Sequence, residues 1–340
     1  MLKKSLLTAF AVFSLICIYT ACQQEEVAPP LIEETVPDRA ALSSSTPTIT
    51  VSNGLLVFAS ESHAATVLAD LEAAAISADD AFVSEYSTLD EDELNDMEDL
   101  VGFNYLQPYI DFEDDLNFSS LRAKVEADIQ TWLDNGGSES DDPDNHFIGD
   151  DLARTILNEQ AEVMIGGSIY KFFENGSYIA ITDGSFTTLT AIRNGGDPDD
   201  YNNVVWFAKN AESCKTNKYT NIYKHSGSGK FRMKCRVGIY YYPWGCGFVA
   251  KTKSYKKKNN GKWRKYRTKI DVCVGGKDCK PDGTMSGPIG PKCKLPMGKK
   301  KKSRSIRLTL EEGCPTTKTL NVQGNHVSSK VGSFLSTLQF

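Results

Sequence analysis

The sequence predicts an α+β protein: an acidic helical domain with a small antiparallel β unit, then an all-β domain, sandwich- or barrel-like, that contains disulfides. Three observations support this prediction. Residues 1–203 carry 8 Lys and Arg against 38 Asp and Glu, a net charge of −30, whereas residues 204–340 carry 30 against 6, a net charge of +24. Apolar residues recur at helical spacing in the first part and alternate in the second. Seven of the nine cysteines lie in the second part.

Residues 1–21 have the layout of a cleaved export signal. A short positive start precedes an apolar run at 6–18, which is too short to cross a bilayer as a helix. Small residues then lead to Cys22, as in a bacterial lipoprotein signal, although Tyr19 replaces the usual leucine. We therefore expect Cys22 to be lipidated and to anchor the mature chain to the membrane. An ordinary secretory signal that is cut nearby is the alternative.

Residues 22–48 are predicted to be a flexible linker. The segment is rich in Pro, Ser and acidic residues and has little apolar periodicity, so it should not fold alone. A flexible chain of about 25 residues reaches roughly 25–30 Å on average. Its first residues, "CQQEE", resemble the acidic signal that sends Bacteroidota lipoproteins to the outer face of the cell. The expected location is the outer membrane, at the cell surface.

Residues 49–203 form the predicted acidic domain. A short strand at 55–59 is followed by a helix that Ser60 or Ser62 caps at its N-terminus. A second helix within 87–103 has acidic residues in its first turn, where the helix dipole favours them. It should bury Leu94, Met97 and Val101. A third helix at 119–137 has one apolar face and ends at a Gly pair.

The pattern changes at 161–182, "AEVMIGGSIYKFFENGSYIAIT". Apolar residues alternate there, and Gly-Gly and Asn-Gly supply turn signals, so the segment predicts strands joined as hairpins. The order of "NGLLVFAS", "LDEDELNDMEDLVGF" and "LNEQAEVMIGGSIYKFFENGSYIAI" resembles that of Bacteroidota cell-surface lipoproteins that carry a domain of unknown function. The resemblance covers roughly residues 50–185. It implies the location and the architecture, and it transfers no catalytic residue.

Residues 204–340 form the predicted basic domain. Segments 230–242, 248–258, 262–276 and 303–312 alternate between apolar and polar residues and are separated by short turns. This pattern favours an antiparallel meander in a β-sandwich or barrel. Between them, segment 275–302 has many Gly and Pro residues and two cysteines, and such a long loop needs a function or a covalent staple.

The seven cysteines of the basic domain are disulfide candidates, because exported proteins favour disulfides. An odd number leaves one thiol over, and the spacing does not select the pairs. Zinc is the alternative, but the close cysteine pairs of zinc sites are missing, so no metal site is expected. The candidates are Cys214, Cys235, Cys246, Cys273, Cys279, Cys293 and Cys314.

Basic residues of the predicted strands could share one face of a sheet and attract polyanions. Two aromatic residues, Trp263 and Tyr266, are candidates for stacking on sugars or bases. The ligand would be an acidic glycan or a surface protein, whereas nucleic acid is disfavoured because no nucleic-acid motif is present. The simplest outcome, however, is that the acidic domain of the same chain neutralises this face, because a net charge of −30 stands beside one of +24. The candidate residues are Arg232, Lys234, Arg236, Lys251, Lys253, Lys265, Arg267 and Lys269.

Two acidic loops, 141–151 and 195–203, concentrate carboxylates of the kind that bind calcium, but neither has EF-hand spacing, so solvated turns are expected. No motif of a nucleophile, a zinc protease or a nucleotide-binding loop is found, and no cofactor is expected. The predicted function is therefore a membrane-anchored surface lipoprotein with a binding or structural role. An exported hydrolase that uses paired carboxylates, as glycosidases do, is the alternative.

Overall fold

The structure, a computed structural model, describes residues 48–207, 217–279, 285–293, 299–309 and 319–339. The predicted signal, Cys22 and residues 23–47 of the linker lie outside the described residues. The contacts group Pro47–Phe340 into one compact unit. The acidic and basic halves therefore pack together within that unit.

The first sheet combines the predicted hairpins with strands far away in the sequence. Its six strands follow the order β1 (Thr50–Ser52), β2 (Leu55–Phe58), β3 (Glu162–Ile165), β4 (Ser168–Phe172), β5 (Tyr178–Ile181) and β6 (Val204–Phe207). The hairpin strands β3, β4 and β5 are antiparallel as predicted. The β unit is not purely antiparallel, however, because β2 and β3 are parallel. Strand β6 pairs with β5, so the sheet extends past the predicted boundary at Asn203.

Local capping explains where the main helices begin. Ser60 accepts a hydrogen bond from the backbone N–H of His63, and Ser120 accepts one from Ala123. Asp90 forms a capping box with Glu93. These caps start α2 (Glu61–Glu85), α3 (Glu91–Val101) and α5 (Leu121–Asp134), while α4 (Gln107–Asp115), α6 (Asp151–Ile156) and α7 (Phe186–Arg193) complete the α-helices of the described residues.

The buried face of α3 differs from the prediction. Leu94 is buried as expected, but Val101 is 51% exposed and Met97 is only half-buried. Asn95 and Glu98 are buried instead. The apolar pattern did not predict this face, because α3 packs against a basic strand and turns its polar side chains toward it.

The basic half contains two antiparallel sheets. The sheet formed by β7 (Lys218–His225), β8 (Phe231–Tyr242), β9 (Gly245–Lys257) and β10 (Trp263–Lys265) is the predicted meander, and β14 (Ser303–Thr309) also pairs with β9. The other sheet has the order β12 (Met285–Cys293), β11 (Thr268–Cys279), β15 (Thr319–Ser328) and β16 (Gly332–Gln339), with β13 (Lys300–Lys301) paired to β11. The prediction of a β-rich second half is confirmed.

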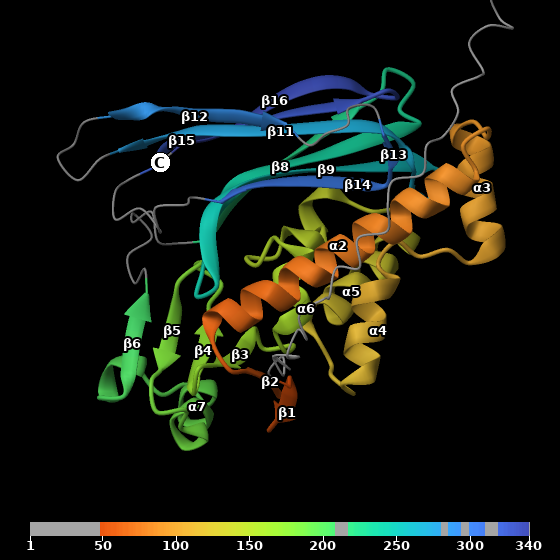
Figure 1. The fold of residues 1–340 in the computed structure, drawn as a ribbon. Helices are drawn as coiled ribbons and strands as arrows, with labels where there is room; N and C mark the ends of the chain where they lie inside the picture. The colour runs from red at the N-terminus through yellow and green to blue at the C-terminus, as the bar shows by residue number, and fades with distance from the viewer. Residues whose placement is uncertain (1–47, 208–216, 280–284, 294–298, 310–318, 340) are drawn as a thin grey trace, which may run out of the picture. The chain divides into compact units, whose positions relative to one another are not determined.

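The meander sheet is covered on both faces (Figure 1). Strands β11 and β15 of the second sheet contact β8 and β9, and a buried apolar cluster lies between the two sheets. Helices of the acidic half lie against the opposite face. Another apolar cluster joins residues of α5 with Tyr255 and Trp263 of the meander sheet. Strand β8, which alternation predicted to be half-buried, is therefore buried along most of its length.

Candidate functional site

The centre of the candidate site is a ladder of basic side chains on the meander sheet. The register of β8 and β9 places Arg236 directly opposite Lys251, and Lys234 opposite Lys253. Like charges at directly opposed positions repel each other and destabilise a sheet. All four side chains are nevertheless buried, with Lys234 only 1% exposed. A buried charge must be paired, so this ladder requires carboxylates from the layer above it.

The loop 139–151 of the acidic half supplies those carboxylates. Two short 3-10 helices, Glu139–Asp141 and Pro143–Asn145, shape it. Asp142 caps the second one, with its side chain accepting a hydrogen bond from the backbone N–H of Asp144. Asp151 follows at the first position of α6. The chain thus brings three carboxylates to the basic ladder within ten residues.

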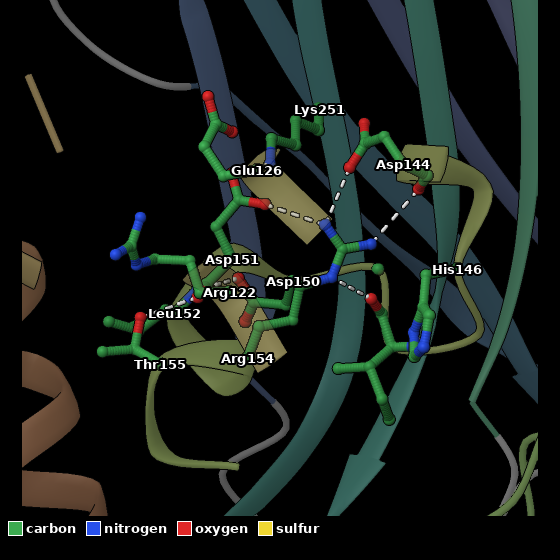
Figure 2. A network of polar contacts seen from close by, with 12 residues as sticks. Arg122, Glu126, Asp144, His146, Asp150, Asp151, Leu152, Arg154, Thr155 and Lys251 are labelled. Atoms are coloured by element: carbon green, nitrogen blue, oxygen red, sulfur yellow. Dashed lines mark hydrogen bonds and ion pairs between the residues drawn. The ribbon is translucent and has the colours of Figure 1, made fainter. Parts of the chain in front are cut away.

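Asp144 lies at the centre of the resulting network and is 1% exposed. Its Oδ2 lies 2.9 Å from Nζ of Lys253 and 3.1 Å from Nζ of Lys234. Its Oδ1 lies 2.9 Å from Nη1 of Arg154 and 3.8 Å from Nη1 of Arg236. Figure 2 shows the guanidinium of Arg154 bonded to Asp144. One carboxylate therefore faces four cations that come from two strands and one helix.

The neighbouring carboxylates complete the network. Lys234 donates a hydrogen bond of 2.7 Å to Asp142, which also accepts one from the Tyr223 hydroxyl. Asp151 pairs with Lys251, and it lies 3.2 Å from Arg154. Each buried lysine of the ladder thus has a carboxylate partner.

Burial and pairing shift the pKa values of these groups in opposing ways. Burial alone would raise the pKa of Asp144, but the charges of Lys234, Lys253 and Arg236 outweigh it and hold that pKa well below its usual value. Burial lowers the pKa of Lys251 to about 7 and that of Lys234 to about 8, in spite of the nearby carboxylates. The aspartate is therefore fixed in its ionised form, which is unsuited to a general acid.

Arg232 continues the ladder, but it is held by aromatic rings. The centre of its guanidinium lies 4.4 Å from the ring centroid of Trp263, 4.6 Å from Trp132 and 5.0 Å from Tyr255. Its Nη1 donates a hydrogen bond of 2.6 Å to the carbonyl of Gly137. Gly137 has φ +58°, and a Cβ there would lie 2.8 Å from Nη2 of Arg232. A side chain at this position would strain the backbone and force the guanidinium to shift, so glycine is suited to this close approach.

A second group of polar contacts joins α2 and α3 to Arg267, which lies between β10 and β11. Arg267 is fully buried, with Nη1 2.6 Å from Oδ1 of Asp79 and Nε 3.0 Å from Oε2 of Glu98. The Asn95 side chain accepts a hydrogen bond from the backbone N–H of Arg267 and donates one to its carbonyl, both 2.7 Å long. Lys302 lies 2.9 Å from Glu98. The helices are therefore attached to the sheet through charge and amide contacts.

These positions agree with neutralisation of the basic face by the acidic half, and not with an open face that binds a polyanion. Six of the eight candidates are buried against the acidic half, namely Arg232, Lys234, Arg236, Lys251, Lys253 and Arg267. Lys265 is paired with Glu126, and Lys269 alone of the eight is exposed. The two stacking candidates are also buried: Trp263 lies over Arg232, and Tyr266 donates a hydrogen bond to Asp92. Neither ring is presented to an outside ligand.

The sequence pattern does not identify the partner carboxylates of the basic ladder. The loop 141–151 was expected to be a solvated turn, yet Asp142 and Asp144 are 4% and 1% exposed. Their neutralisation by lysine and arginine also leaves them unsuited to hold calcium. Among the described residues, no group of His, Cys, Asp and Glu is arranged to hold a metal ion. The number of basic residues on the predicted strands could have indicated these partners, since each buried cation needs an acidic residue beside it.

One of the disulfide candidates, Cys235, is a free and buried thiol. Burial raises the pKa of this thiol to about 12, which keeps it protonated and unreactive. Cys214 and Cys314 lie outside the described residues, as do the side chains of Cys279 and Cys293. The strand register sets Cys293 directly opposite Cys273.

Comparisons with known proteins give one similar structure. No protein-family model matches the chain, and no curated protein matches it. The chain is similar to the crystal structure of a DUF4848 family protein from Bacteroides thetaiotaomicron, with 14% sequence identity, coverage of 86% of this chain and 100% of that chain, and a TM-score of 0.21. A match at this level assigns neither a fold nor a function to the chain.

Proposed function

We propose that the protein is an exported lipoprotein, anchored by lipid on Cys22 to the outer membrane at the cell surface, with a binding or structural role. The support comes from the short apolar run ahead of Cys22 and from the acidic linker that follows it. Within the described residues, none of the helices has the length and apolar character needed to span a bilayer. In this proposal the lipid holds the chain, and the folded part stands away from the headgroups.

The observation that carries the structural part of the proposal is the neutralised basic ladder. Asp144 and its neighbours occupy the side chains that would otherwise attract a polyanion. The basic face thereby holds the acidic helices in place and leaves a ligand to bind elsewhere on the surface. Asp144 is unsuited to be the acid of the hydrolase alternative, because its pKa is depressed whereas a glycosidase acid has a raised pKa.

We further propose that disulfides staple the basic half. The opposed positions of Cys273 and Cys293 on β11 and β12 support one bridge, since directly opposed residues of antiparallel strands come within disulfide range. Cys246 is buried, and neither Cys246 nor Cys273 is a free thiol. An oxidising location outside the cytoplasm would allow such bridges to persist.

The experiment that tests the proposed function compares the native chain with Cys22→Ala in a Bacteroidota host. We expect the native chain to incorporate an alkyne-tagged fatty acid, to lose residues 1–21 by intact mass, and to be degraded by protease added to whole cells. Cys22→Ala should lose the lipid label, while Cys235→Ala should keep it. A labelled native chain that resists external protease in intact cells but not in lysed cells would contradict the surface location. An unlabelled native chain would contradict the anchor.

A further inference from the structure

A hollow of about 480 Å³ lies beside the charge layer. Its walls come from three separate segments: the loop at 145–147, the β4–β5 turn at 174–175, and the start of β7 with the preceding Asn217. The volume is within the range of roughly 300–1,000 Å³ that is typical of small-molecule sites. The charge network fixes the position of the first wall, because this loop also carries Asp144.

Side-chain amides dominate the polar part of the lining. Asn217 is held by the backbone of Tyr241 and forms a fixed part of the wall. Asn221 accepts a hydrogen bond of 2.7 Å from Arg236 through Oδ1, and Asn175 accepts hydrogen bonds from Ser177 through Oδ1. These contacts orient both amides and leave their N–H groups as donors. Ligand hydroxyl oxygens are matching acceptors.

His146 adds a neutral donor. Its Nδ1 accepts a hydrogen bond of 3.0 Å from the backbone N–H of Ile148, so the ring proton is placed on Nε2. Burial, together with the charges of Arg154 and Arg236, lowers the pKa of His146 to about 4. The imidazole is therefore uncharged at neutral pH, and it offers an N–H with no positive charge.

Two aromatic surfaces complete the lining. The rings of His146 and Phe147 stack with centroids 4.1 Å apart, and both are half-buried. The Tyr219 ring is fixed by its hydroxyl contact with Tyr242. Flat apolar rings beside oriented amides match the two kinds of surface of a sugar ring, its C–H face and its hydroxyl rim.

The charges of the lining select against an ionic ligand. Lys218 and Glu174 are the basic and the acidic residue of the lining, and their charges are of opposite sign. Glu174 is also the one carboxylate among the lining residues that the structure describes. Hydrolysis of a glycosidic bond by the common mechanism needs two carboxyl groups, so the lining is suited to binding and not to cleavage.

We propose that this hollow binds an uncharged glycan, with the amides and His146 contacting hydroxyl groups and Phe147 contacting a sugar face. This deepens the binding role proposed above and moves it from the basic sheet to the hollow. It does not require the lipid on Cys22, so a failure of one proposal does not decide the other.

The test measures the affinity of the purified full-length protein in detergent for cellotriose, maltotriose and chitotriose, with trigalacturonate as an acidic counterpart. Isothermal titration or ligand-observed NMR provides the readout. We expect saturable binding of at least one neutral trisaccharide and none of trigalacturonate. Binding of trigalacturonate alone, or of no sugar, would overturn the proposal.

Two substitutions test the location of binding. Phe147→Ala should weaken the affinity about tenfold or more. Asn145→Ala, which removes an exposed side-chain amide of the lining, should weaken it about three- to tenfold, the usual value of one hydrogen bond. The matched control is Asn135→Ala, which removes an exposed amide at the end of α5, outside this hollow. Because Phe147 also packs against the core, Asn145→Ala decides the question if the first variant unfolds. Unchanged affinity in folded Asn145→Ala and Phe147→Ala would place the glycan elsewhere and overturn the proposal.

Discussion

At the scale of single residues, the stability of the protein depends on carboxylates that neutralise buried cations. Asp144 contacts Lys234, Lys253, Arg154 and Arg236 while it is 1% exposed. Removing one member of a buried pair is much more costly than the pair is worth, because the remaining charge stays desolvated. The network is thus a structural requirement at this position.

We predict that Asp144→Asn lowers the free energy of unfolding by about 3–5 kcal/mol, because it leaves buried cations uncompensated. Urea denaturation monitored by tryptophan fluorescence measures the change. Asp141→Asn, an exposed neighbour in the same loop, should change stability by less than about 0.5 kcal/mol. Equal effects of the two substitutions would show that burial of the network does not matter.

The same carboxylate predicts a dependence on pH. The pKa of Asp144 is depressed in the folded state, so its stabilising contribution is present above the unfolded pKa of about 3.9 and is lost as pH falls through the folded pKa. The difference in stability between the native chain and Asp144→Asn should therefore be constant from pH 7 to about pH 5 and shrink below it. A difference that grows on acidification would contradict this assignment.

His326 predicts a second pH effect, between the two sheets. It is fully buried, with Nδ1 2.9 Å from the Thr252 hydroxyl and Nε2 2.7 Å from the Ser336 hydroxyl. Burial lowers its pKa to about 4, so the unfolded state binds the proton first as pH falls below about 6.5.

We expect His326 to lower the free energy of unfolding by about 2–3 kcal/mol as the pH falls from about 6.5 to about 4. Urea unfolding of the native chain and of His326→Gln at pH 7, 5.5 and 4.5 measures this slope, which should be shallower in the variant. His225→Gln, at an exposed histidine, provides the control. A slope that is unchanged in His326→Gln would rule out this source of acid sensitivity.

At the scale of elements, helices are attached to the basic sheet by polar contacts as well as by apolar packing. Asn95 of α3 bonds to both backbone groups of Arg267, next to the start of β11, and Glu98 pairs with its side chain. These contacts explain why α3 buries polar residues while Val101 stays exposed. This attachment fixes the position of α3 along the sheet, because the N–H and C=O of Arg267 can bond only one side-chain amide.

We predict that Asn95→Ala loosens α3 locally and destabilises the protein by about 1–3 kcal/mol, since it leaves the backbone groups of Arg267 without their partners. Hydrogen–deuterium exchange should show faster exchange in α3 and at the start of β11, and no change in α7. Asp96→Ala, at the adjacent exposed position, should leave the exchange of α3 unchanged. Loss of protection in both variants would indicate a general effect on the helix.

At the scale of the whole molecule, the two halves of opposite charge depend on each other. The ladder of Arg236, Lys251, Lys234 and Lys253 is stable only when the loop at 139–151 covers it. The apolar core that joins α5 with Tyr255 and Trp263 also crosses the boundary between the halves. Neither half contains all the residues that its own buried charges and apolar side chains contact.

We therefore expect residues 217–340, expressed without the acidic half, to aggregate or to lack a cooperative unfolding transition. Co-expression with residues 22–207 as a separate chain should restore solubility, because it returns the carboxylates and the helix face. Circular dichroism and size-exclusion chromatography provide the measurements. A soluble basic half with a sharp thermal transition of its own would show that the acidic layer is dispensable.

Much of the local structure follows from the sequence because it depends on neighbours in the chain. The caps at Ser60, Asp90 and Ser120 and the hairpins of β3–β5 are produced by local hydrogen bonds and turn residues. The alternation of β8 also predicted which side chains share a face. The parallel pairing of β2 with β3 was not predictable in this way, since no local pattern records which distant strand is a neighbour.

The sequence by itself determined the charge division, the helices α2, α3 and α5, the hairpin strands β3 to β5, the strands β8 and β9, and the grouping of basic side chains on one sheet face. It did not predict β12 and β13, which lie in the segment 275–302 that was taken for a loop. Only the tertiary structure decided that this face is covered and that Asp144 neutralises it. The physical reason is that alternation fixes the direction of a side chain from its own backbone, whereas burial depends on what packs above it. Packing of the acidic half makes the basic face an internal contact, and the amide-lined hollow lies beside it.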